Sequence, residues 1–424
     1  MRTMRPGSRG PSVELLQLAL SRCGIYTETD GIFGKATEAA LRSFQRSRNL
    51  IADGIAGRET HRALLPWYTG YTTYRIKKGD TLYTLAQGFG SSAEAIELAN
   101  PGLIPARLDV SSSIVIPLGF DVVPTNINWC AALLGYCVRG LSVRYPFLSI
   151  GEIGRSIMGR PLWRLSIGQA ERSVLYNAAH HANEWICTPL LLKFLEQLCA
   201  AFASGGSLYG YSAAEILDSA TINFVPALNP DGIDLVTGEL QNGEFYRQAQ
   251  HIAADYPQFP FPSGWKANIR GTDLNLQYPA DWQQAKLNKY AQGIVSPAPG
   301  DYVGAYPLSA PESRAMYDYT LALSPELILS YHTQGQVIYW KYKDIKPPRA
   351  LEIGEVLSAA SGYPLESTPY ASGFAGWKDW FIDSFDRPGY TIEAGQGINP
   401  LPLSQFDEIY KDNLGLLVLA ALSD

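Results

Sequence analysis

Apolar positions near the N-terminus recur at helical spacing and are interrupted by two similar turns. Val13 and Leu16 fall on one face of a predicted helix, and the pattern Asp-Gly-Ile-x-Gly-x-x-Thr occurs at residues 30–37 and again at 53–60. Each Asp-Gly pair favours a turn, and each threonine lies where a helix is expected to begin. The pattern predicts a small three-helix domain over residues 1–68.

In residues 71–120 the polar and apolar positions follow strand spacing at both ends and helical spacing between them, which predicts a second small domain. A predicted strand that begins near Tyr74 ends at a Gly-Asp turn. Asp80 or Thr81 can then cap a helix that runs through residue 87. Asn100 precedes a proline and ends the next helix, and Ser113–Pro117 has the composition of a strand. The predicted order is strand, helix, helix, strand.

The remaining residues, 124–424, predict a large α/β domain. Short apolar runs alternate with longer stretches of helical periodicity, as expected for strands that alternate with helices. A helix is expected over about 184–201, directly after the first of these runs. The predicted strands are residues 173–178, 221–227, 326–331 and 389–392.

Composition limits the classes of protein that fit this pattern. The chain has 424 residues, 46% of them hydrophobic and 17% charged, which is ordinary for a globular protein. A net charge of −6 gives no support for nucleic-acid binding, and the longest apolar run, 416–422, is too short to cross a membrane. The five cysteines lack CxxC spacing and are expected to be reduced. We therefore expect a protein without a signal peptide that binds neither nucleic acid nor membrane, and that is either cytoplasmic or released by a route that its sequence does not reveal.

Two distant segments together supply the minimum ligand set of a catalytic zinc ion. His181 and Glu184 follow a predicted strand at a spacing that directs both side chains to one side, and His332 follows another predicted strand. Open α/β sheets place ligand sites at the carboxyl ends of their strands. His180 is an alternative to His181. Glu393, on a later apolar strand, is expected to act as general base, the alternative being a structural ion pair.

The same residues carry a resemblance to known families. Residues 126–424 resemble the zinc carboxypeptidase family, which implies a mixed eight-stranded sheet flanked by helices. Residues 1–68 resemble a peptidoglycan-binding domain, with Gln17 and Gln45 at its glutamine positions, and residues 71–120 resemble LysM. The shared motifs of the large domain are His181-x-x-Glu184, Asn229-Pro230-Asp231-Gly232, Gly271-Thr272-Asp273-Leu274-Asn275, His332, Tyr370, Asp379-Trp380 and Thr391-Ile392-Glu393.

This resemblance implies a role for each matched residue. His181, Glu184 and His332 become the ligands of one Zn2+ per chain, and Asp273 becomes the carboxylate that orients His181. Tyr370 is expected to close over the substrate, the alternative being a packing role. The family's oxyanion-binding arginine lies in the loop 265–270, where Arg270 is our choice and Lys266 the reserve.

Two positions depart from the family. Carboxypeptidases have Asn-Arg where this chain has Asn275-Leu276, and leucine cannot supply the charge-assisted hydrogen bond to a free C-terminus, worth roughly 1.5–3 kcal/mol. Lys378 lies where the family forms the floor of its side-chain pocket and is expected to favour a leaving residue whose side chain ends in a carboxylate. The alternative is that Lys378 points into solvent.

The domain layout together with Leu276 resembles that of zinc endopeptidases of the γ-D-glutamyl-L-diamino acid type. This resemblance implies cleavage of the γ-D-glutamyl–diaminopimelate bond in peptidoglycan stem peptides. The expected partners are stem peptides and glycan that contains N-acetylglucosamine. One alternative is a metallocarboxypeptidase that removes the terminal residue of the stem, with Arg270 or Lys378 as carboxylate anchor. The other is a non-catalytic protein that binds the cell wall or the spore.

Overall fold

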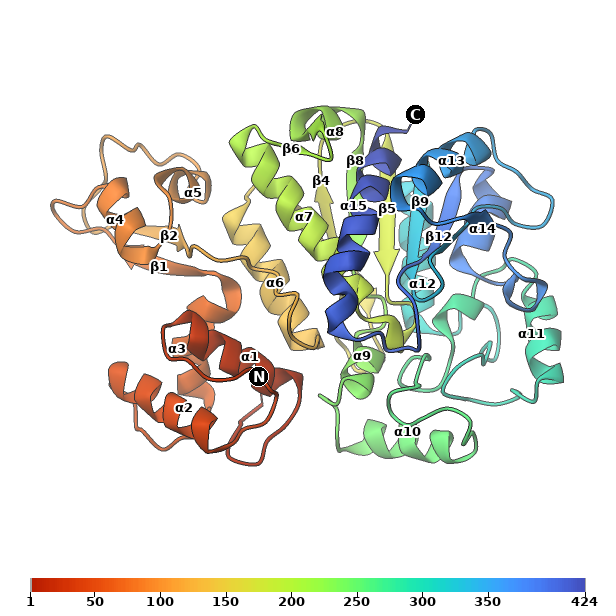
Figure 1. Cartoon of the computed structure of the whole chain (residues 1–424), viewed down its shortest axis with the longest axis horizontal. Helices are drawn as coiled ribbons and strands as arrows, with labels where there is room; N and C mark the ends of the chain where they lie inside the picture. The colour runs from red at the N-terminus through yellow and green to blue at the C-terminus, as the bar shows by residue number, and fades with distance from the viewer. Residues whose placement is uncertain (1, 424) are drawn as a thin grey trace. The chain divides into compact units, whose positions relative to one another are not determined.

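The computed structural model describes residues 2–423 and divides into two compact units, the second of which begins at Ile150. Each unit is described separately (Figure 1). The five cysteines are free thiols. Within residues 2–423, every helix is too short or too polar to traverse a bilayer.

The first unit opens with the three predicted helices, α1 (Pro11–Arg22), α2 (Lys35–Ser47) and α3 (Arg58–Thr69). The repeated turns are held in the same way. The Gln17 side chain donates to Asp30 and Thr37 and accepts from Gly31 N–H. Gly31 has a positive φ of 69°, a backbone conformation that favours glycine. Gln45 makes the matching contacts in the second turn. A glutamine on each preceding helix therefore fixes each turn.

The helices α2 and α3 begin two residues before the threonines at which the repeats predict them. Gly34 and Gly57 occupy the N-cap positions. The side chains of Thr37 and Thr60 accept from the glutamines instead of capping. His61 is buried, and its Nδ1 lies 3.0 Å from Tyr68 OH, within hydrogen-bond distance.

The next segment has the predicted order of strand, helix, helix and strand. The strand β1 (Tyr71–Arg75) pairs antiparallel with β2 (Ser113–Pro117). Between them lie α4 (Leu82–Phe89) and α5 (Ala93–Leu98), and the Thr81 side chain caps α4 by accepting from Thr84 N–H. A small apolar core forms from Ile76, Leu82, Leu85, Ala86, Ile96, Ile114 and Ile116. Helix α6 (Ala131–Arg144) completes the first unit and contacts α1, α3 and β1.

The second unit is built on a mixed sheet of eight strands in the order β11-β10-β12-β9-β5-β8-β4-β3. The four central strands, β12, β9, β5 and β8, are parallel, and the flanking pairs β10–β12 and β8–β4 are antiparallel. The strands are β3 (Ser149–Arg155), β4 (Pro161–Ile167), β5 (Ser173–Ala178), β8 (Thr221–Val225), β9 (Leu327–His332), β10 (Val337–Tyr339), β11 (Leu365–Glu366) and β12 (Gly389–Glu393). A two-stranded sheet, β6 (Ser207–Leu208) and β7 (Tyr211–Ser212), lies apart from it.

Helices pack against this sheet, so its central strands are buried. Helix α7 contacts β5, α14 contacts β9 and β12, and α15 contacts α7, α8 and α13 (Figure 1). The α-helices are α7 (Cys187–Ser204), α8 (Ala213–Ser219), α9 (Pro230–Val236), α10 (Glu244–Ala254), α11 (Trp282–Ala291), α12 (Pro311–Leu323), α13 (Ala350–Ser361), α14 (Trp377–Phe385) and α15 (Phe406–Leu422). Short 3-10 helices are η1 (Ala182–Glu184), η2 (Leu274–Leu276), η3 (Tyr370–Ser372) and η4 (Leu403–Gln405).

The strand register brings the chemically active residues to one edge of the sheet. Because β5 and β9 are parallel neighbours, with Ala178 opposite Tyr331, their carboxyl ends lie side by side. His181 follows the first strand and His332 ends the second. On the next strand, β12, Glu393 is the register partner of His332. The topology alone therefore places two imidazoles and a carboxylate close together.

Candidate active site

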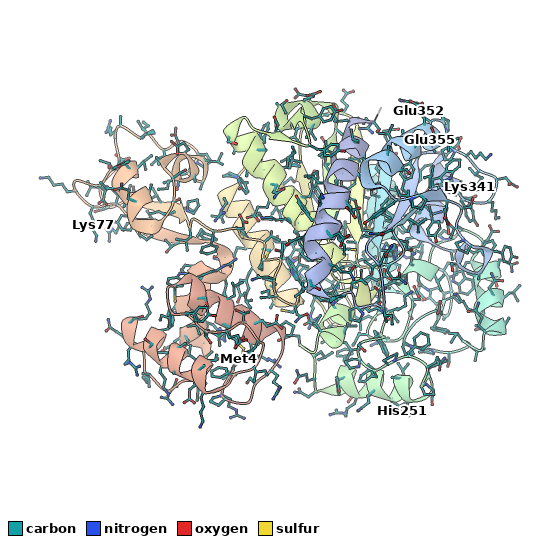
Figure 2. The ribbon with its side chains drawn as sticks, in the orientation of Figure 1. Met4, Lys77, His251, Lys341, Glu352 and Glu355 are labelled. Carbon is teal, nitrogen blue, oxygen red and sulfur yellow. The ribbon has the colours of Figure 1, made fainter. Side chains whose placement is uncertain are left out.

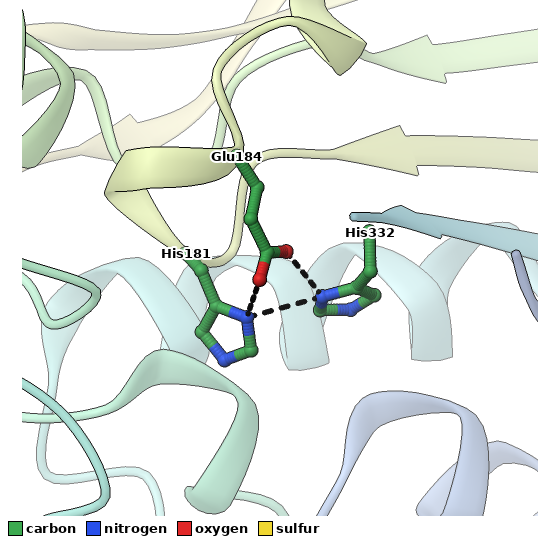
Figure 3. A group of neighbouring side chains, drawn as sticks. All are labelled: His181, Glu184 and His332. Carbon is green, nitrogen blue, oxygen red and sulfur yellow. Dashed lines mark hydrogen bonds and ion pairs between the residues drawn. The ribbon is translucent and has the colours of Figure 1, made fainter. Parts of the chain in front are cut away.

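A histidine, a glutamate and a second histidine converge at this edge (Figure 3). The Nδ1 atoms of His181 and His332 lie 3.2 Å apart. They approach different oxygens of Glu184, at 2.9 Å for His181 and 2.8 Å for His332. Ligands at 2.0–2.1 Å from a tetrahedral ion are roughly 3.3 Å from one another. The three side chains therefore have the donor types and spacing of a tetrahedral metal site.

Burial and pairing control the charges of this cluster. All three residues are buried. Burial alone would raise the pKa of Glu184, but the adjacent His181 and His332 lower it well below its usual range. Burial lowers the pKa of His332. Glu184 is therefore an ionised carboxylate in a desolvated position, where a cation compensates its charge.

The His181 ring is oriented by a second carboxylate. Its Nε2 lies 3.2 Å from Asp273 Oδ1, which leaves Nδ1 directed at Glu184 and His332. Asp273 is fixed in turn by Asp301 N–H, which donates to Oδ2 at 3.1 Å. Against the effect of its own burial, the His181 imidazole lowers the pKa of Asp273. A partner of this kind sets the tautomer of a metal-binding histidine.

His180 lies next to the cluster but does not join it. Its Nε2 is 3.0 Å from Tyr278 OH, and its ring stacks on His332 with centroids 5.8 Å apart. Burial lowers the pKa of His180 well below its usual value, so the ring is neutral. The geometry thus favours His181 over His180 as the ligand.

Glu393, the last residue of β12, lines the same cavity as His181, Glu184 and His332. Burial first, and then the nearby Glu184 carboxylate, raise the pKa of Glu393 to about 8. A divalent cation bound at the cluster would act in the opposite direction and favour the carboxylate. Glu393 is thus positioned to take up and release a proton beside the cluster.

The loop before Asp273 separates the two candidate oxyanion residues. Asn268 closes a turn by accepting from Arg270 N–H and Thr272 N–H, each at 3.1 Å. Arg270 at the tip of this turn is exposed and lines a different cavity. Lys266, before the turn, lines the cavity of the cluster, with Nζ 4.0 Å from Glu184 Oε1. The structure brings Lys266 to the site and leaves Arg270 outside it.

This cavity has a volume of about 350 Å3 and takes in the other predicted binding residues. Leu276 is 8% exposed and lines it. Asn275 accepts from Trp377 N–H at 3.0 Å, and its Nδ2 lies 3.4 Å from His332 Nε2. Lys378 also lines the cavity and is only 4% exposed, so it does not point into bulk solvent.

Tyr370 lies beside the cavity and does not form its wall. It is 70% exposed in η3, and its ring packs edge-on against Phe374 with centroids 5.0 Å apart. The neighbouring Pro369 and Ser372 do line the cavity. The structure therefore places Tyr370 on a surface segment next to the opening.

Two charged residues of this cavity were missed in the sequence. Lys289 on α11 is 7% exposed, and its Nζ lies 2.6 Å from Asp301 Oδ1. Both residues line the cavity, and Asp301 also holds Asp273 through its backbone. No motif marks either residue. Lys289 is one of two lysines on α11, and the sequence pattern does not set it apart from Lys286.

The fold and site define a class of protein: an α/β metallopeptidase with a mixed sheet and a metal-binding cluster at the carboxyl ends of its central strands. The family comparison agrees, since the zinc carboxypeptidase family model matches residues 137–415. The chain belongs to the zinc carboxypeptidase family, which implies a zinc cofactor. Two further family models match, a peptidoglycan binding domain at residues 9–64 and a LysM domain at 74–117.

Individual relatives support this assignment. Gamma-D-glutamyl-L-diamino acid endopeptidase 1 of Lysinibacillus sphaericus is 39% identical over 69% of this chain and 72% of its own length. The protein YqgT of Bacillus subtilis is 38% identical over 64% of this chain and 72% of its own length. The structure of bovine thrombin-activatable fibrinolysis inhibitor matches with a TM-score of 0.53 at 19% identity, over 69% of this chain and 96% of that one, which shows a shared fold.

Proposed function

We propose that the protein is a zinc-dependent endopeptidase that cleaves the γ-D-glutamyl–diaminopimelate bond in the stem peptides of peptidoglycan. The observation that carries the proposal is the convergence of His181, Glu184, His332 and Glu393 on one cavity. The relative that is 39% identical is named a gamma-D-glutamyl-L-diamino acid endopeptidase, and diaminopimelate is a diamino acid. The matches to peptidoglycan binding and LysM domains support the same class of substrate.

His181, Glu184 and His332 would hold one Zn2+ per chain. The donor set fits, because two imidazole nitrogens and one carboxylate oxygen lie within 4.8 Å of one another. When bound there, zinc supplies Lewis acidity to a water molecule and to the scissile carbonyl. Asp273 would hold the His181 ring in its ligating orientation.

Glu393 would move the proton in this reaction. Its carboxylate accepts a proton from the attacking water and returns it to the amine of the leaving diamino acid. Its place on β12, opposite His332, keeps it within the cavity. Tyr370, at the opening, would contribute a hydrogen bond to the bound peptide.

Lys266 would stabilise the negative charge that develops on the carbonyl oxygen. Although burial lowers its pKa, Glu184 and Asp273 raise it, and the net effect is a raised pKa that keeps the ammonium charged. Its side chain is 31% exposed and borders the cavity, so the charge is accessible to a substrate. A positive charge that is already in place before the reaction stabilises the transition state, in which the carbonyl oxygen becomes negative, more than it stabilises the bound substrate.

Replacing Lys266 with alanine should therefore lower kcat by about 10²–10³-fold, the usual effect of removing one oxyanion contact. The matched variant Arg270→Ala, four residues away in the same loop, should stay close to the parent rate because Arg270 lines another cavity. Steady-state kinetics on a stem tripeptide measures both, and Lys266→Arg should recover part of the rate. A large loss with Arg270→Ala and none with Lys266→Ala would reverse the assignment.

Leu276 makes an endopeptidase a better fit than a carboxypeptidase. The position that would hold a substrate's terminal carboxylate is apolar, so a free C-terminus is not required. The peptidoglycan binding and LysM matches in the first unit suggest that this unit also helps the enzyme to reach its substrate. If the first unit binds glycan, it raises the local concentration of stem peptide around the catalytic unit without adding catalytic contacts.

Digestion of defined stem tetrapeptides by the zinc-loaded protein tests this function. We expect mass spectrometry to show release of a fragment that begins at diaminopimelate, at similar rates for a free and an amidated C-terminus. Release of the terminal residue alone, with the amidated peptide uncut, would indicate a carboxypeptidase. The absence of any cleavage would favour a wall-binding role.

A further inference from the structure

Two consecutive residues of opposite charge lie buried in the wall of the active-site cavity. Lys378 and Asp379 on α14 are 4% and 2% exposed, and both line the cavity. Lys378 Nζ lies 2.6 Å from Asp379 Oδ1 and also donates to Lys341 O at 2.8 Å and Thr368 Oγ1 at 3.3 Å. Lys378 is therefore already matched by a carboxylate, and this part of the wall carries two charges but no net charge.

The Asp379 carboxylate is less well satisfied than the Lys378 ammonium. Its buried Oδ1 has no aligned hydrogen-bond donor among the described residues, so the contact with Lys378 is an ion pair without hydrogen-bond geometry. A buried carboxylate oxygen without a donor is costly unless a ligand compensates it. The Asp379 carboxylate, which lines the cavity, can therefore accept a further hydrogen bond from a ligand.

The pair is close to the metal-binding cluster. A Cβ added at Gly376 would lie 3.0 Å from Asp379 Oδ2 and 3.7 Å from Asn275 O, so these groups are neighbours. The Asn275 side chain in turn approaches His332 Nε2 at 3.4 Å. A substrate whose scissile bond lies at the cluster would therefore bring its adjacent side chain towards the pair.

We propose that Lys378 and Asp379 together recognise a side chain that ends in both a carboxylate and an ammonium group, as the free end of diaminopimelate does. This inference rests on the proposed function and refines the expectation that Lys378 alone selects a carboxylate. A zwitterionic end can place its carboxylate near Lys378 and its ammonium near Asp379, so each buried charge gains an opposite partner. A side chain with one charge brings an unmatched charge beside a neutral pair, which is unfavourable at a buried site.

A series of four tripeptides, L-Ala-γ-D-Glu-X, separates these charges. The residue X is meso-diaminopimelate, 2-aminopimelate (the carboxylate alone), lysine (the ammonium alone) or norleucine (neither). For the full-length zinc-loaded protein, we expect kcat/KM to be highest for diaminopimelate, at least about tenfold above both singly charged peptides. Equal values for diaminopimelate and 2-aminopimelate would refute a role for Asp379, and equal values for all four would refute the inference. If no peptide is cleaved, the proposed function itself fails.

Variants then assign each charge through ratios measured within one protein. In Lys378→Met the ratio of diaminopimelate to lysine should fall towards one, and in Asp379→Asn the ratio of diaminopimelate to 2-aminopimelate should do so. The double variant removes both charges and leaves no unpaired buried ion, so it serves if a single variant does not fold. The exposed Lys346→Met is the matched control and should keep the parent ratios. Parent ratios in the double variant would show that the pair is structural only.

Discussion

Replacing Glu393 with glutamine should lower kcat/KM by about 10²–10⁴-fold, the usual contribution of general acid–base catalysis. Glutamine has nearly the same shape but cannot accept a proton from water. Glu393 is not one of the three candidate zinc ligands, which are His181, Glu184 and His332. The variant should therefore retain one zinc per chain. Kinetics on a stem tripeptide and metal analysis of the same preparation measure the two quantities together.

A matched glutamate shows whether the effect is specific. Glu355 is exposed on α13, as its label in Figure 2 shows, and Glu355→Gln should keep the parent rate. If Glu393→Gln hydrolysed stem peptides at the parent rate, Glu393 would be part of a structural ion pair and another group would serve as base. Loss of zinc together with activity would indicate that Glu393 supports the metal site instead.

Removal of a ligand has the second large expected effect. In His332→Ala, zinc should be lost by dialysis and hydrolysis should fall below detection. Loss of an outer partner of a ligand costs roughly 10–100-fold in metal affinity, and loss of a ligand should cost more. The variant also leaves Glu184 as a buried carboxylate with one fewer partner, so its thermal stability must be measured alongside.

The exposed His251 provides the control for this variant. It lies on α10 (Figure 2), and His251→Ala should keep both zinc and activity. Retention of stoichiometric zinc by a folded His332→Ala would contradict the ligand assignment. The fold of both proteins can be checked by circular dichroism before the comparison is made.

The strands that carry the site could be predicted because they are short, continuous apolar runs. The predicted strand at 173–178 matches β5, and that at 326–331 is shifted by one residue from β9, so that His332 is its last residue. The parallel pairing of these strands then brings their ends together. Local sequence pattern and general sheet geometry were therefore sufficient to bring the two segments together, whereas the choice of His181 over His180 depended on the family resemblance.

The helix after β5 was predicted with the wrong start. It was expected from residue 184, but Ala182–Glu184 form a 3-10 turn and α7 begins at Cys187. Pro189 is the third residue of this helix, a position in the first turn where its missing N–H is tolerated. That proline was the available signal for the later start.

The walls of the cavity could not be derived in the same way. Lys266 and Arg270 are both cations of one loop. The backbone of Lys266 is held beside the cluster by hydrogen bonds with Pro299 and Ala182, whereas Arg270 lies in the turn that Asn268 closes. Lys289 and Asp301 reach the cavity through a helix and a loop without any motif. Direction in an irregular segment depends on tertiary contacts, which spacing in the sequence does not encode.

The central claim is that His181, Glu184 and His332 bind one zinc ion. Anomalous scattering from crystals of the zinc-loaded protein, recorded on both sides of the zinc absorption edge, tests it most directly. The account predicts one strong peak per chain, bounded by the Nδ1 atoms of both histidines and the carboxylate of Glu184. A peak at any other group of residues, or none at this cluster in crystals that contain zinc, would contradict it.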